Sequence, residues 1–123
     1  MTNIPTVRAF CEAWTSRDPD MIVALMSEEC FYHNVPMAPL VGRAAIAEFI
    51  RGFLGDAQTV EFEILAIAEA EDGTVLTERV DHFDYGGQRL ALPVMGSFRI
   101  ENGLVSRWLD YFDMAPFAAM GGE

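Results

Sequence analysis

The segment Thr77-Glu78-Arg79-Val80-Asp81-His82-Phe83 predicts a β-strand that carries two opposite charges on one face. Alternate residues of a strand share a face, so Arg79 and Asp81 lie side by side. Thr77 and Phe83 share that face, whereas Glu78, Val80 and His82 point the other way. The segment contains no turn signal and lies between apolar neighbours. We therefore expect the charged pair in the interior or on the wall of a pocket.

The segments around this strand predict an antiparallel meander. Apolar residues alternate over 60–67, and Asp72-Gly73 predicts the turn into the charged strand, which is expected over 74–85. Two further turn signals follow, Gly86-Gly87 and Asn102-Gly103. They predict strands over 88–101 and 104–113.

The first half of the chain predicts helices. Helical spacing of apolar residues predicts a helix over 5–17, and Asp18-Pro19 predicts the start of a second helix that continues through Met26. A short strand over 30–35 and a proline-rich loop over 36–39 precede a third helix over 43–54. Helices gathered on one face of a meander give an α+β fold, in which a curved sheet wraps around the helices and leaves a cone-shaped pocket. We expect residues 1–123 to form one domain.

Composition excludes several classes of function. The net charge is −11, from 19 acidic residues against 8 arginines and no lysine. Such a surface repels nucleic acid and anionic membranes, and the missing lysines exclude Schiff-base chemistry. No apolar run is long enough to span a bilayer, and no basic segment followed by an apolar stretch marks the N-terminus for secretion. We expect a cytoplasmic protein.

The cysteines and histidines predict no metal or cofactor site. Cys11 and Cys30 lack a metal-binding or redox spacing and stand in apolar contexts, so we expect buried free thiols. His33 and His82 are too isolated to form a metal site.

Two other expected strands carry polar residues among apolar ones. Tyr32 and Asn34 share a face of the strand over 30–35, and Asp110 lies between Trp108 and Phe112 on a face of the last strand. A buried carboxylate needs a partner because its desolvation is costly. Arg79 is the natural partner of Asp110.

This cluster allows two interpretations. Asp81, Arg79 and Asp110 could form a structural ion-pair network, with Tyr32 and Asn34 as satisfied core residues. Alternatively, two aspartates around one arginine leave an excess negative charge, so one of them keeps a proton and the site holds both a base and an acid. Such a pair can activate water while protonating a leaving oxygen, as epoxide opening requires. Tyr32 and Asn34 could then position the water.

Three motifs carry a resemblance to a known family: Tyr32-His33-Asn34-Val35-Pro36-Met37, Thr77-Glu78-Arg79-Val80-Asp81 and Trp108-Leu109-Asp110-Tyr111-Phe112-Asp113. In these motifs and in the order of its elements, the chain resembles the limonene-1,2-epoxide hydrolase family. That family lies within the nuclear-transport-factor-2-like (NTF2-like, also SnoaL-like or cystatin-like) fold, which packs helices on a curved, mostly antiparallel mixed sheet. Some members have a longer N-terminal segment than this chain.

The resemblance implies roles for five residues. Asp110 would be the base acting on water, Asp81 the acid donating to the epoxide oxygen, and Arg79 the bridge between them. Tyr32 and Asn34 would position the water together with Asp110. It also implies one-step hydrolysis without cofactor or metal, and a homodimer.

The expected outer face of the sheet supports dimerisation independently, because it is rather apolar for a monomer surface. This face should carry Leu65, Ile67, Val80, Leu109 and Tyr111, mixed with Glu63, Glu78 and Arg107.

Apolar residues expected near the pocket suggest a hydrophobic, alicyclic epoxide as substrate. They are Trp108, Phe112, Phe83, Leu92 and Met37, and ordinary core packing is the commoner role for each. The tail after Met114 could be mobile or could cover the pocket mouth. Two alternatives remain open: a ketosteroid isomerase or polyketide cyclase of the same fold, and a non-catalytic module for binding hydrophobic ligands or for dimerisation.

Overall fold

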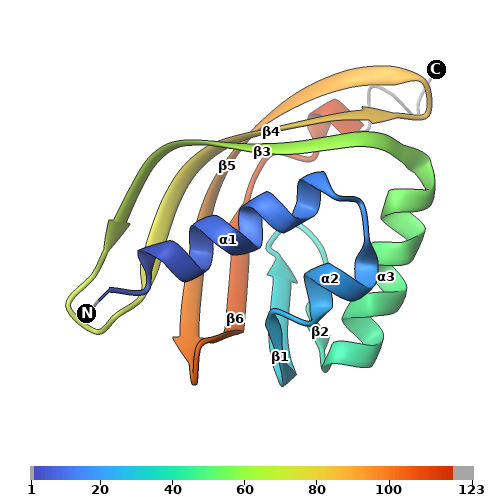
Figure 1. Cartoon of the computed structure of the whole chain (residues 1–123). Coiled ribbons are helices and arrows are strands. Elements are labelled where there is room, and N and C mark those ends of the chain that lie inside the picture. The colour runs from blue at the N-terminus through green and yellow to red at the C-terminus, as the bar shows by residue number, and fades with distance from the viewer. Residues whose placement is uncertain (1, 118–123) are drawn as a thin grey trace.

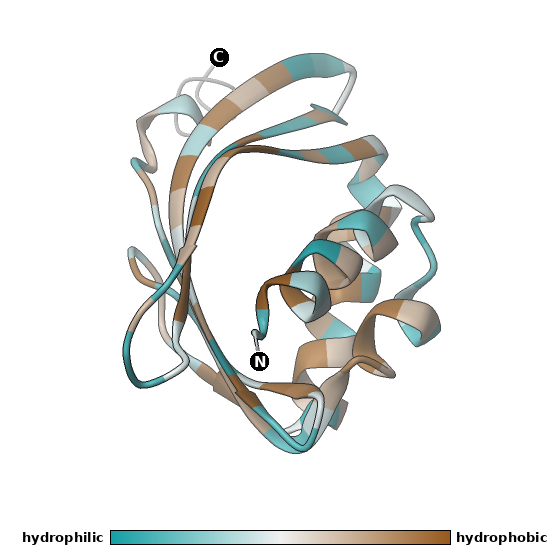
Figure 2. Cartoon of the chain, turned by 60° about the vertical axis from the view of Figure 1, so that its left-hand side comes forward, coloured by the Kyte–Doolittle hydropathy of each residue, from teal (hydrophilic) through white to brown (hydrophobic). Residues whose placement is uncertain are grey.

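A six-stranded sheet curves around the helices, as Figures 1 and 2 show for the computed structural model, which describes residues 2–117. The strand order is β2-β1-β6-β5-β4-β3, and only the β1–β6 pairing is parallel. Hydropathy alternates along the strands because successive side chains face the helices and the outside in turn (Figure 2). The expected α+β fold with a mostly antiparallel mixed sheet is confirmed.

Three helices lie in the first half of the chain: α1 (Ile4–Thr15), α2 (Pro19–Val23) and α3 (Arg43–Asp56). The Asp18 side chain caps α2 by accepting a hydrogen bond from the Asp20 backbone N–H at 3.0 Å. The expectation that this helix continues through Met26 is wrong. Val105 donates a backbone hydrogen bond to the Leu25 carbonyl, and Met26 pairs with Val105. The chain therefore joins the sheet at Met26 and cannot continue as a helix. Among the described residues, no helix is long and apolar enough to cross a membrane.

The strands are β1 (Met26–Asn34), β2 (Leu40–Val41), β3 (Ala57–Glu69), β4 (Val75–Tyr85), β5 (Gln88–Glu101) and β6 (Leu104–Tyr111). No pattern in the sequence predicted β2, which is only two residues long and pairs with the middle of β1. The first strand was expected to start at residue 30 and the last to end at 113, so both bounds differ from the structure. The four expected strands of the meander are present with turns at the expected positions.

The strand pairing brings distant polar residues together on the concave face. In the parallel β1–β6 pair, Tyr32 lies opposite Trp108 and Asn34 opposite Asp110. Across the meander, Gly96 of β5 lies opposite both Thr77 of β4 and Asp110 of β6.

The core fills the space between α1 and this face with aromatic rings. The Phe10 ring lies 4.9 Å from that of Trp108, and Trp14 stacks on Phe62 at 5.0 Å. These contacts bury the middle of α1 against the sheet.

A β-bulge changes which residues face outward on β3. The register shifts between Ile64 and Ala66, so Ile67 lies opposite Thr77, faces inward and packs against the core. The expectation that Ile67 belongs to the outer face is therefore wrong. Strands β3 to β6 still expose four large apolar side chains there, which we call the outer apolar patch: Leu65, Leu76, Met95 and Tyr111.

Candidate active site

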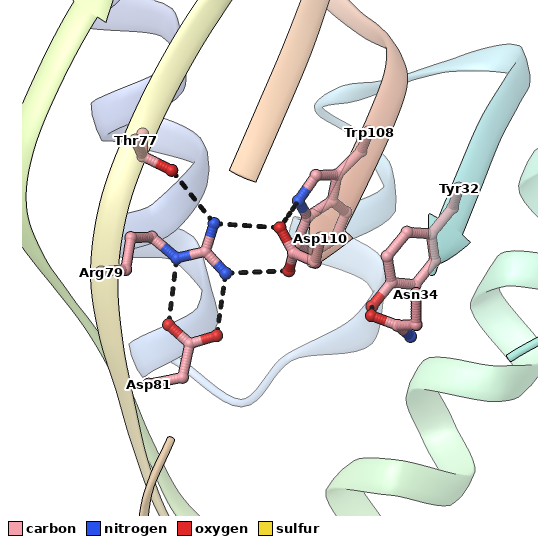
Figure 3. Close-up of polar contacts among 7 residues, drawn as sticks. All are labelled: Tyr32, Asn34, Thr77, Arg79, Asp81, Trp108 and Asp110. Atoms are coloured by element: carbon pink, nitrogen blue, oxygen red, sulfur yellow. Dashed lines mark hydrogen bonds and ion pairs between the residues drawn. The ribbon is translucent and has the colours of Figure 1, made fainter. Parts of the chain in front are cut away.

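Arg79 is the centre of a buried polar network on the concave face (Figure 3). Its guanidinium donates through Nε and Nη2 to Asp81 at 3.0 and 2.8 Å, and through Nη1 and Nη2 to Asp110 at 3.1 and 2.8 Å. Nη1 also donates to the Thr77 hydroxyl at 3.3 Å. An arginine side chain has five N–H donors, and these bonds occupy all five. The guanidinium also lies 4.8 Å from the centre of the Phe62 ring.

The two carboxylates differ in their surroundings. Asp110 accepts a further hydrogen bond of 2.7 Å from the Trp108 indole N–H, whereas within residues 2–117 the Asp81 carboxylate is held by the guanidinium alone. Burial raises the pKa of Asp81 from 3.8 to about 6, although its bonds to Arg79 oppose the shift. The surroundings of Asp81 therefore favour its protonated form.

Tyr32 and Asn34 form a second polar group beside Asp110 (Figure 3). The Tyr32 hydroxyl donates to Asn34 Oδ1 at 3.1 Å, and its ring stacks on Trp108 with 4.2 Å between ring centres. Burial raises the pKa of Tyr32 well above its ordinary value, which keeps the phenol neutral. In the described part of the chain, no direct hydrogen bond joins this pair to Arg79 or to the two carboxylates.

Sequence reasoning missed Gly96, on which the network depends. A Cβ atom at this position would lie 2.5 Å from Arg79 Nη1, 2.8 Å from Asp110 Oδ1 and 2.9 Å from Thr77 Oγ1. The absent side chain therefore makes the room that the guanidinium occupies. A glycine inside a strand often marks such a close approach, and Gly96 is the one glycine inside the expected strand over 88–101.

A cavity of about 780 Å³ opens above Asp81 and Asp110, and Tyr32 and Asn34 contribute to its wall. Four of the five apolar residues expected near it do line it: Met37, Phe83, Leu92 and Phe112. Trp108 does not, because it lies behind Tyr32 and Asp110 with its ring 5.7 Å from that of Phe98. From the tail after Met114, Phe117 lines the cavity and packs on Phe83, while residues 118–123 lie outside the described part of the chain.

The remaining polar residues singled out in the sequence lie away from this cavity. Cys11 and Cys30 are buried free thiols, as expected, and burial raises the pKa of each to about 12. His33 donates to the Met37 carbonyl at 2.8 Å, and His82 lies 2.8 Å from a Glu63 carboxylate oxygen. No group of three or more metal-ligating side chains with metal-binding geometry occurs among residues 2–117.

The fold and the inward-facing pocket place the chain in the NTF2-like class. A SnoaL-like protein structure from Shewanella putrefaciens CN-32 superposes with a TM-score of 0.83 over 96% of each chain, and its 17% identity shows the fold alone. An LEH-like epoxide hydrolase structure from M. tuberculosis has 32% identity and a TM-score of 0.81, covering 92% of this chain and 79% of that one.

The sequence comparisons identify the family within this class. Residues 1–120 match the family model described as limonene-1,2-epoxide hydrolase catalytic domain, so the chain belongs to this family. Epoxide hydrolase EphG of Mycobacterium tuberculosis (strain ATCC 25618 / H37Rv) is 33% identical over 109 residues, which cover 88% of this chain and 71% of that protein. The family that the three sequence motifs predicted is therefore confirmed.

Proposed function

We propose that this protein is an epoxide hydrolase that adds water to a hydrophobic, alicyclic epoxide and releases a vicinal diol. The observation that carries the proposal is the pair of carboxylates bridged by one buried guanidinium at the floor of an apolar cavity. Membership of the limonene-1,2-epoxide hydrolase family and the similarity to an epoxide hydrolase support it.

The reaction takes place in one step. Asp110 removes a proton from water, the water oxygen bonds to an epoxide carbon, and the carbon–oxygen bond of the ring breaks as Asp81 donates its proton to the leaving oxygen. Asn34 Oδ1 accepts the second proton of the water in a hydrogen bond, and Tyr32 holds the amide in place through its own bond to Oδ1. One proton enters the site and one leaves it, so the total charge of Asp110, Arg79 and Asp81 stays constant.

The pKa of Asp81 sets the fraction of enzyme molecules in which this acid is protonated and can donate to the epoxide oxygen. With a pKa of about 6, about a tenth of the unliganded molecules hold the proton on Asp81 at pH 7. A hydrophobic substrate that displaces water from the cavity disfavours the ionised form further. The acid is therefore kept protonated chiefly in the substrate complex.

A ketosteroid isomerase or polyketide cyclase of the same fold needs an aspartate base and a neutral acid donor in an apolar cavity. Isomerases of this kind keep the donor neutral by surrounding it with apolar groups. Here, Arg79 instead bridges two carboxylates with two hydrogen bonds to each, an arrangement that fits an acid and a base acting together in one step better.

A single-turnover reaction in ¹⁸O-labelled water tests the one-step route. Direct attack by water puts the label into the first diol formed. Label that enters only after the enzyme has turned over once would indicate an ester intermediate and overturn the mechanism. Isomerisation of a ketosteroid without any epoxide turnover would instead favour the isomerase, and tight ligand binding without turnover the binding module.

The protein also forms a homodimer in this proposal, through the outer apolar patch. Met95 and Tyr111 pair across β5 and β6 and are 55% and 52% exposed, which is unusual for large apolar side chains on one contiguous face. Light scattering should give the mass of a dimer for the unaltered chain and of a monomer for Met95→Glu. A monomeric unaltered chain would contradict this part of the proposal.

A further inference from the structure

Helix α3 contains a glycine that the fold does not require. Gly52 lies in the interior of α3, outside the positive-φ region where glycine is favoured. A Cβ atom built there meets no atom of residues 2–117 within 4 Å. Glycine lowers helix stability relative to alanine because it loses more backbone freedom on folding. Neither backbone conformation nor packing among residues 2–117 therefore explains glycine at this position.

The open space beside Gly52 belongs to the cavity above the two aspartates. Gly52 lines this cavity, as do Phe49 and Phe53 on the same side of α3. The Gly86 backbone N–H donates to the Asp56 carbonyl at 3.3 Å, which ties the β4–β5 turn to the end of α3. Gly52, Glu48 and Asp56 line the cavity and are also exposed, so this part of α3 forms the mouth of the cavity.

The side chains on either side of Gly52 are acidic. Glu48 and Asp56 lie one turn before and one turn after Gly52, and both line the cavity. None of the described lining residues is basic. Arg79 lies beneath the floor and is fully occupied by its five hydrogen bonds. A negatively charged group at the mouth would thus meet two carboxylates and no cation from the described lining.

We propose that Gly52 determines substrate specificity by leaving a channel across α3 for a substituent of the epoxide. The substituent passes between Glu48 and Asp56, so it is neutral or cationic, and epoxides with a carboxylate at that end are excluded. This inference rests on the proposed epoxide hydrolysis and names the class of epoxide that the site takes.

Gly52→Leu tests the channel, and Gly55→Leu is its matched control. Gly55 lies in the same helix and does not line the cavity. A Cβ atom built there also meets no atom of the described residues within 4 Å. The two substrates are cyclohexene oxide and a cyclohexene oxide that carries a neutral butyl ester. Gly52→Leu should lower kcat/KM for the ester by about tenfold or more and leave cyclohexene oxide within about threefold. Gly55→Leu should leave both unchanged.

Stability separates this role from a structural one. Alanine at position 52 or 55 should raise Tm by a similar amount, about 3 °C, because both positions are helical and unobstructed. If Gly52→Leu kept the wild-type ratio of the two substrates, or if the wild type hydrolysed only cyclohexene oxide, the channel would be disproved while epoxide hydrolysis stood. A wild type that hydrolysed neither would overturn the proposed function itself.

The charge of the substituent is tested with three cyclohexene oxides of equal length that end in a methyl ester, a trimethylammonium group or a carboxylate. At low ionic strength, the wild type should use the carboxylate at least about tenfold less well than the ester. The double variant Glu48→Gln/Asp56→Asn should reduce this difference, as should added salt. Equal use of carboxylate and ester by the wild type would overturn the proposed charge selectivity.

Discussion

Arginine–aspartate pairs occur both at the cavity floor and on the surface, and the two kinds differ sharply. At the floor, the guanidinium of Arg79 and both carboxylates are buried, and its Nη2 lies 2.8 Å from each aspartate. On the surface, Arg51 and Asp20 are 3.8 Å apart, with side chains 59% and 86% exposed. The same chemical groups are thus held by several short bonds in one place and by one long contact in the other.

Stability does not explain why the floor network is built as it is. A buried ion pair gives little net stabilisation, because desolvation offsets the attraction, and here two carboxylates compete for one cation. An exposed pair contributes little either, but it costs little to form. A network that costs free energy to bury and lies beneath a cavity is better explained by the proposed catalytic role than by stability. Four changes test this contrast between the buried network and the exposed pair.

The largest effect is expected from Asp110→Asn and Asp81→Asn. Each removes one of the two groups that we propose transfer protons while keeping the size of the side chain, so kcat should fall by about 10³-fold in both. Circular dichroism should show that the fold survives. Asp20→Asn, which alters the surface pair, should leave kcat unchanged. If either floor variant retained wild-type turnover, the assigned mechanism would be wrong.

Gly96→Ala should disturb the floor network without removing any of its groups. The new methyl group would overlap Arg79 Nη1 and Asp110 Oδ1, so the guanidinium must shift. We expect a loss of about 2 kcal/mol in the free energy of unfolding, measured with urea, and a fall in kcat of at least about tenfold. Gly55→Ala is the control, because its methyl group meets nothing. Unchanged kcat in Gly96→Ala would mean that the network tolerates a displaced arginine.

The pH dependence should be smaller and should come from Asp81. The proposed reaction uses the protonated form of this group, so kcat/KM should fall as pH rises through about 6, approaching tenfold per unit. Because the pKa is raised above the unfolded value of 3.8, the ionised form is disfavoured by folding, and stability should also decline as pH rises from about 4 to about 6. Rates and Tm between pH 4 and 9 test both trends. A value of kcat/KM that stays constant from pH 6 to 9 would contradict the assignment of Asp81 as the acid.

The smallest effect is expected from Arg51→Ala, which removes the surface pair with Asp20. Exposed pairs contribute less than about 1 kcal/mol, and alanine is a good helix former, so Tm should change by less than about 2 °C. The initial rate of epoxide hydrolysis should be unchanged. A loss of stability as large as that in Gly96→Ala would remove the contrast between the two kinds of pair.

Much of the network at the cavity floor was predictable because side chains alternate between the two faces of a strand. Arg79 and Asp81 share a face by their spacing, and the meander brings Asp110 to the same side. The bulge that turns Ile67 inward was not predictable, because the alternation of apolar residues in β3 fits either register. The packing of Trp108 behind the cavity and the space left by Gly96 depend on neighbours from other strands, which spacing along one strand does not reveal.

The hydrogen bonds from Arg79 to both aspartates also limit how the two carboxyl groups can regain their initial protonation after a turnover. In the proposed mechanism, each turnover leaves a proton on Asp110 and takes one from Asp81, so the proton must return to Asp81 before the next reaction. All four carboxylate oxygens face guanidinium N–H groups, which are permanently protonated and cannot relay it. The return route therefore runs through water that refills the cavity after the diol leaves, and recovery between turnovers should slow in deuterated solvent.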